Sequence, residues 1–151
     1  MRKSEAINSF NLIVKLTEPG QLDEYYDKDL SILQHFKEPW NVLFLRGSKN
    51  TYITAVDPEL LRDISQSKAI SYNMIRKRLA KANLTLRLKE IRSYFATYLR
   101  NHGILPEYID IYQGRVGKSI FQRHYMKIED LRALSMQILK LSKELETTVQ
   151  E

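Results

Sequence analysis

The strongest constraint on the fold is an apolar stripe in the last quarter of the chain. Its members recur at helical spacing and predict a long amphipathic terminal helix: Ile128, Leu131, Leu134, Ile138, Leu141 and Leu145. A second stripe, in a helix predicted over 86–102 and ended by Gly103, consists of Leu88, Ile91, Phe95 and Leu99. Each stripe must bury one face against other elements, so the chain is expected to build a packed, largely helical domain.

Further helices are predicted from breakers and caps. We expect one over 4–16, capped by Ser4, with Ile7, Phe10, Ile13 and Val14 on its buried side. Pro58 starts another through Ile64, after Asp57 as its cap. The remaining predicted helices cover 21–26, 72–82, 106–112 and 118–125. The apolar segment 30–36 fits helix or strand.

Strand signals are confined to the first half. The runs 40–45 and 51–56 flank a turn-forming segment, 46–50, and together predict a hairpin. The predicted fold class is therefore α+β and mostly α, a helical domain with a small antiparallel sheet at one side.

Composition narrows the class of protein. The 151 residues fit one domain, 1–151, and a hydrophobic content of 43% is enough for a core. No apolar run is long enough to span a membrane, and the polar N-terminus does not open a secretory signal, so a cytoplasmic protein is expected. The chain has no cysteine, and His35, His102 and His124 share no metal-ligand spacing. We therefore expect no metal and no nucleotide cofactor.

Positive charge is concentrated in the second half. Residues 1–70 carry nine Lys/Arg and ten Asp/Glu, whereas residues 71–151 carry fifteen and eight. Eight cations and one anion, Glu90, lie between Arg76 and Arg100. This asymmetry favours a surface that binds a polyanion, although a basic helix face that is merely solvated gives the same pattern.

Three short motifs carry candidate chemistry. Lys89 and Arg92 are three residues apart and share a helix face, where an anion would relieve their repulsion. Arg115 follows Gln113 and Gly114, and ten residues later comes Tyr125, flanked by cations that lower the cost of a phenolate. Taken singly, these residues also fit an exposed helix face, a loop cation and a core tyrosine.

In combination, these motifs resemble the active site of tyrosine recombinases, or integrases. The box from Lys89 through Ser93-Tyr94-Phe95-Ala96-Thr97-Tyr98-Leu99 to Gly103-Ile104 matches theirs, with Lys89 in the usual histidine place. Gln113-Gly114-Arg115 and the spacing to Tyr125 are similar to integrases of archaeal spindle-shaped viruses. The resemblance implies site-specific DNA recombination through a 3′-phosphotyrosyl intermediate, with Tyr125 as nucleophile. Arg92 and Arg115 would bind the nonbridging oxygens, aided by Lys89.

The resemblance assigns further residues. Lys49, in the predicted hairpin, would protonate the departing 5′ oxygen. The family's first arginine lies in a segment resembling Thr-Gly-x-Arg-x-Ser-Glu; aligned with Thr17-Glu18-Pro19-Gly20, it places Gln21 at the arginine and Glu24 at the glutamate. Gln21 is thus a possible weakened position; Arg2 or Arg46 could substitute for the arginine in space, but nothing in the sequence supports either. The DNA backbone would be tracked by Arg76, Lys77, Arg78, Lys81 and Arg87.

The resemblance also implies the partners. They are double-stranded DNA and further copies of the chain, in a tetramer on DNA held through the terminal helix, although that helix fits equally well against its own domain. The chain would be the C-terminal catalytic domain of an integrase, without the family's N-terminal DNA-clamping domain. Two alternatives stand beside the enzyme: a catalytically impaired DNA-binding relative, in which Gln21 marks lost cleavage, and a helical interaction module with another partner.

Overall fold

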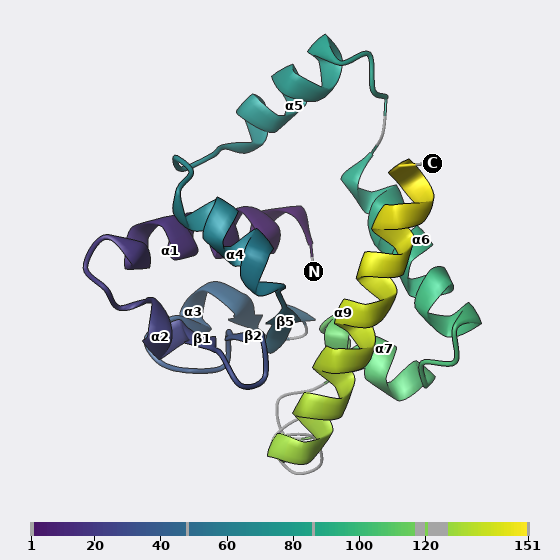
Figure 1. Cartoon of the computed structure of the whole chain (residues 1–151). Helices are drawn as coiled ribbons and strands as arrows, with labels where there is room; N and C mark the ends of the chain where they lie inside the picture. The colour runs from purple at the N-terminus through teal and green to yellow at the C-terminus, as the bar shows by residue number, and fades with distance from the viewer. Residues whose placement is uncertain (1, 48, 86, 117–119, 121–126, 151) are drawn as a thin grey trace.

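The computed structural model describes residues 2–47, 49–85, 87–116, 120 and 127–150 of the chain. It is mostly helical with a small antiparallel sheet, which confirms the predicted fold class. Helices α1 to α4 surround the sheet on one side of the molecule, and α6, α7 and α9 form the other side (Figure 1). Helix α5 stands apart above both groups in this view. No helix in the described part of the chain has the length and apolarity needed to cross a membrane.

Helix α1 spans Lys3–Thr17 and buries a different face from the one predicted. Its buried residues are Glu5, Ser9, Leu12, Ile13 and Leu16. Ile7, Phe10 and Val14, expected in the core, are only half-buried, and Ser4 lies inside the helix rather than capping it. The prediction was wrong because it ranked faces by apolar residues alone. The inward face of α1 instead begins with a carboxylate, Glu5.

The three-stranded sheet has the order β1-β2-β5 and is antiparallel throughout. The short helix α2, Leu22–Tyr25, leads into β1, Tyr26–Asp27. Strand β2, Ile32–Gln34, lies in the segment that the sequence left undecided, and it pairs with β5, Ile53–Ala55. Because β2 and β5 are buried along both faces, strict alternation of polar and apolar residues is absent from them.

The predicted hairpin is correct at its turn and wrong in its strands. Only β3, Leu45–Arg46, pairs with β4, Lys49–Asn50, while Asn41–Phe44 forms a one-turn helix, α3. The second predicted strand is β5, which leaves the hairpin and joins the sheet. Phe44 is fully buried, so the apolar run before the turn packs into the core as a helical turn instead of a strand.

The helices of the second half begin and end close to the predicted residues. Helix α4, Pro58–Ser65, is capped by Asp57, whose side chain accepts a hydrogen bond from the Glu59 N–H. Helix α5, Tyr72–Lys81, buries none of its residues. Helices α6, Leu88–Asn101, and α7, Pro106–Tyr112, follow, and Gly103 adopts a φ of 84° just after α6. The predicted helix over 118–125 falls largely outside the described residues.

The terminal helix α9, Ile128–Gln150, packs on its own chain. Its stripe is buried at Leu131, Leu134, Ile138 and Leu141. The Ser135 hydroxyl donates to the Leu30 carbonyl at 2.6 Å, and Lys143 pairs with Asp57 at 2.6 Å. Of the two placements left open by the sequence, the structure has the one on its own domain, because the chain itself covers the apolar stripe.

One histidine, His35, is buried in the core. His35 is fully buried, its Nδ1 lies 2.6 Å from the Tyr25 hydroxyl, and its Nε2 lies 2.8 Å from the Thr54 hydroxyl. Burial lowers the pKa of His35 from 6.5 to about 3, because the charged imidazolium would lose its hydration. The native protein therefore holds a neutral ring in a pH range where the unfolded chain binds a proton.

Stability should consequently fall as the pH drops below 6.5. Between pH 6.5 and 5 we expect the free energy of unfolding to decrease by up to about 1.4 kcal/mol per pH unit. Urea unfolding at several pH values measures this slope. His35→Gln should flatten it, whereas the exposed control His102→Gln should not. A slope that survives in His35→Gln would contradict the assignment.

Candidate functional site: a cationic cleft

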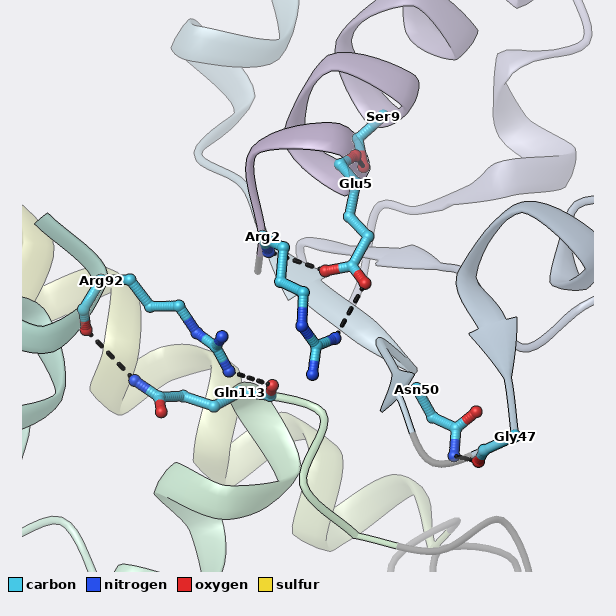
Figure 2. A network of polar contacts seen from close by, with 7 residues as sticks. All are labelled: Arg2, Glu5, Ser9, Gly47, Asn50, Arg92 and Gln113. Atoms are coloured by element: carbon cyan, nitrogen blue, oxygen red, sulfur yellow. Dashed lines mark hydrogen bonds and ion pairs between the residues drawn. The ribbon is translucent and has the colours of Figure 1, made fainter. Parts of the chain in front are cut away.

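Arg92 is held by reciprocal hydrogen bonds with Gln113. The Arg92 Nη2 donates to the backbone carbonyl of Gln113 at 2.7 Å, and the Gln113 Nε2 donates to the backbone carbonyl of Arg92 at 3.2 Å (Figure 2). Gln113 is 4% exposed and follows α7, whereas Arg92 is half-buried in the second turn of α6. The guanidinium is thus fixed in place before any ligand arrives.

Arg2 approaches the same space from the start of α1. Its Nη1 donates to the Glu5 carboxylate at 3.0 Å, and its backbone N–H donates to the other carboxylate oxygen at 2.7 Å. Burial raises the pKa of Glu5, but its interactions with the Arg2 backbone N–H, with Thr51 and with the Arg2 side chain outweigh burial, and the net pKa is lowered. Glu5, 2% exposed, is therefore an ionised anchor for Arg2. Figure 2 shows the Arg2 and Arg92 guanidinium groups turned toward the gap between α1 and α6.

Arg2 and Arg115 both lie within electrostatic range of Arg92. The pKa of Arg92 is lowered first by burial and then by repulsion from Arg2 and from Arg115, while Glu5 acts in the opposite direction. Like charges at this range raise the free energy of the empty site. An oxyanion that contacts all three would remove that cost and gain charge-assisted hydrogen bonds. The arrangement is thus suited to a phosphate.

Arg2 and Arg92 both line a cleft of about 920 Å³ between α1, α5 and α6. Six cationic side chains line it: Arg2, Lys3, Arg76, Arg87, Lys89 and Arg92. The rest of the lining is largely small or apolar and includes Tyr72, Leu79 and Leu84. A concave space lined by this much charge concentrates a strong positive potential. The cleft therefore favours an extended polyanion over a neutral ligand.

The structure brings together several of the residues predicted from sequence. Lys89 is exposed and lines the cleft with Arg92. Arg115 interacts electrostatically with Arg92, and its Nη1 donates to Asp110 at 3.2 Å. Lys49 lies in β4, and its backbone pairs with Arg46. Tyr125, the expected nucleophile, lies outside the described residues.

The predicted DNA-binding residues occupy one side of the cleft and the helix above it. Arg76 of α5 and Arg87, the residue before α6, line the cleft. Lys77, Arg78 and Lys81 are exposed elsewhere on α5. Because α5 buries none of its own side chains, all four of its cations are available to a ligand.

Gln21 is not among the residues that line this cleft. It is exposed just before α2, where its backbone bonds with Leu16 and Glu24. Sequence reasoning named Arg2 only as a substitute in space, with no motif behind it, and the structure places Arg2 in the cleft lining with Arg92. A signal was present, because Arg2-Lys3-Ser4-Glu5 reproduces the Arg-x-Ser-Glu part of the segment that had been aligned at Gln21.

Metal ligands do not gather in this region. Within the described part of the chain, no three or more His, Asp or Glu side chains are grouped in a way that could hold a metal ion. The charge in the cleft is supplied by arginine and lysine side chains.

Comparison with known proteins gives one match. A family model described as archaeal phage integrase matches residues 17–134, which include Lys49, Lys89, Arg92, Arg115 and Tyr125 and begin after Arg2. No curated protein and no solved structure matches the chain. Since the matched segment covers well over half of the sequence, the chain belongs to the archaeal phage integrase family.

Proposed function

We propose that this chain cuts and rejoins DNA by tyrosine-mediated phosphoryl transfer. Family membership supports site-specific recombination in general. The observation that carries the finer proposal is the cleft lined by six cations, with Arg92 fixed by Gln113 and within electrostatic range of Arg2 and Arg115. Such a group fits the phosphorane-like charge that develops when a phosphodiester is attacked.

The proposed reaction exchanges one phosphodiester for another. The Tyr125 oxygen forms a bond to phosphorus, and the bond to the 5′ oxygen breaks, leaving the 3′ phosphate on the tyrosine. Arg2, Arg92 and Arg115 neutralise the nonbridging oxygens, and Lys89 adds charge from the same helix face as Arg92. Lys49 gives a proton to the departing 5′ oxygen. A second 5′ hydroxyl then reverses these steps.

We infer that Arg2 takes the place of the first catalytic arginine. Glu5 holds Arg2 by two hydrogen bonds, and Arg2 lies close enough to Arg92 to lower its pKa. If Arg2 is the first catalytic arginine, the neutral side chain of Gln21 does not remove a positive charge from the site. This inference weakens the case for an impaired DNA-binding relative, which depended on Gln21 standing at that position.

Family membership and the charge of the cleft both support DNA as the partner, whereas the tetramer stays a prediction. The exposed cations of α5 extend the cleft and would bind backbone phosphates on either side of the cleaved linkage. The stripe of α9 does not support an assembly, because Leu131, Leu134, Ile138 and Leu141 are buried in their own chain. A tetramer on DNA would have to use another surface.

The nucleophile can be tested with a nicked suicide substrate, on which the covalent intermediate accumulates. We expect an SDS-resistant protein–DNA adduct that Tyr125→Phe abolishes. Tyr94→Phe is the control, since Tyr94 is a 61% exposed tyrosine of α6. DNA binding without any adduct in the unchanged protein would favour the non-catalytic relative. An adduct that persists in Tyr125→Phe would exclude Tyr125 as the nucleophile.

The reassignment of the first arginine gives a paired test. Arg2→Ala should slow single-turnover cleavage on the order of 10²–10³-fold, as expected for losing one charged donor at the transition state. Gln21→Ala should leave the rate unchanged. Because Arg2→Ala also leaves Glu5 without its partner, the double variant Arg2→Ala/Glu5→Gln should be slowed alike. Equal losses in Arg2→Ala and Gln21→Ala would contradict the reassignment.

The binding mode predicts a steep dependence on salt. Each neutralised phosphate contributes about −0.9 to the slope of log affinity against log salt. Replacing Arg76, Lys77, Arg78 and Lys81 by Ala should flatten the slope by up to roughly 3.6 if each contacts one phosphate. Filter binding or fluorescence anisotropy over a salt series measures it. Salt-insensitive binding would favour the interaction-module alternative.

A further inference from the structure

The segment that precedes Arg115 contacts two other parts of the site. Gln113 bonds Arg92 at both its guanidinium and its backbone carbonyl, at 2.7 and 3.2 Å. Gly114 meets the β3–β4 hairpin, which carries Lys49: its carbonyl accepts a hydrogen bond from the Asn50 N–H at 3.3 Å. Arg115 then continues the same turn. The three consecutive residues Gln113, Gly114 and Arg115 thus link helix α6, which carries Lys89 and Arg92, to the hairpin that carries Lys49. Arg2 is the described member of the proposed catalytic group that they do not contact through these bonds.

The contact at Gly114 leaves no room for a side chain. A Cβ placed there would lie 1.8 Å from the Asn50 carbonyl oxygen and 2.6 Å from its carbon. The φ of Gly114 is +67°, in the region that favours glycine. The backbone of Gly114 packs directly against the backbone of Asn50. The turn that contains Gly114 therefore determines where this part of the hairpin lies.

Asn50 is held within the hairpin by further hydrogen bonds. Asn50 is 3% exposed, pairs with Leu45 across the hairpin, and donates from its side chain to the Gly47 carbonyl at 2.7 Å. Figure 2 shows this Asn50–Gly47 bond on the hairpin, across the site from Arg92. A shift of Gly114 would therefore displace Asn50 and the residues bonded to it, Leu45 and Gly47.

We propose that Gln113 and Gly114 are positioning residues, which hold Arg92 and the β3–β4 hairpin in a fixed relation to Arg115. This inference rests on the proposed strand-cleavage function. Neither residue needs to touch DNA, since Gln113 and Gly114 are both buried. Their effect passes through the groups they orient. Transition-state stabilisation by several donors requires all of them to be in place together, and a displacement of about 1 Å can cost roughly 10²-fold in rate.

Gln113→Leu tests the first half of the proposal. We expect single-turnover cleavage to slow by about 10²-fold while DNA affinity stays unchanged, because affinity comes mainly from backbone phosphates elsewhere. Gln34→Leu is the matched control: Gln34 is also buried, at 7% exposure, and bonds Asp27 at 3.2 Å. Cleavage at the original rate in Gln113→Leu, or equal slowing in both variants, would overturn the proposal.

Gly114→Ala tests the second half. Gly20→Ala is its control, since Gly20 has a similar φ of +71° but no heavy atom within 4 Å of an added Cβ. Both variants carry the strain of a positive φ, and only Gly114→Ala displaces the hairpin. We expect cleavage to be lost in Gly114→Ala at a temperature where both variants are folded by circular dichroism. Similar rates in the two variants would overturn the role of Gly114.

A readout without catalysis separates this inference from the proposed function. Nitrogen-15 NMR of the arginine side chains should show a distinct, slowly exchanging Arg92 Nη2–H signal, which Gln113→Leu removes and Gln34→Leu retains. If the unchanged protein forms no adduct but the signal behaves in this way, the cleavage function fails and the positioning stands. If the protein cleaves DNA and neither its rate nor the signal responds to Gln113→Leu, the positioning fails and the function stands.

Discussion

Repulsion between the half-buried Arg92 and its neighbouring arginines, Arg2 and Arg115, is the interaction on which the rest of this structure depends. Arg92 has no carboxylate partner among its described hydrogen bonds; its guanidinium rests on a backbone carbonyl and faces two further cations. Folding alone gains little from such an arrangement, because like charges oppose each other more strongly where water is excluded. The surrounding contacts have to offset that cost. Glu5 does so for Arg2, Gln113 for Arg92 and Asp110 for Arg115.

This electrostatic cost explains features that otherwise conflict with a well-packed fold. A carboxylate occupies the inward face of α1 because Arg2 must be held at the edge of the cleft. Buried polar atoms of Arg92 and Gln113, Nε and Oε1, have no partner within the described part of the protein. Helix α5 remains outside the core, and its Arg76 lines the cleft instead. At Arg92, an anion can accept the hydrogen bond that the buried Nε–H lacks.

The positions of the helices could be predicted from sequence more accurately than the strand pairing or the arrangement of the site residues. Proline, glycine and cap residues placed α4, α6 and α7 because those signals act within a few residues. The pairing of β5 with β2 rather than with the hairpin depends on contacts between distant segments, which no local pattern encodes. Arg92, Arg115 and Lys89 could be proposed from sequence because their motifs are contiguous. Arg2 could be named only as a substitute in space, because a competing alignment, at Thr17–Glu24, satisfied the glycine and glutamate but not the arginine. The roles of Gln113 and Gly114 are visible only once α6, the turn and the hairpin are placed together.

The central claim is that Arg2, Arg92 and Arg115 form one oxyanion site. A crystal structure of the chain grown with inorganic vanadate or sulfate tests it most directly. The account predicts a tetrahedral anion with oxygens about 3 Å from guanidinium nitrogens of all three arginines. An anion bound only along α5, or three guanidinium groups that point to separate regions of solvent, would contradict it.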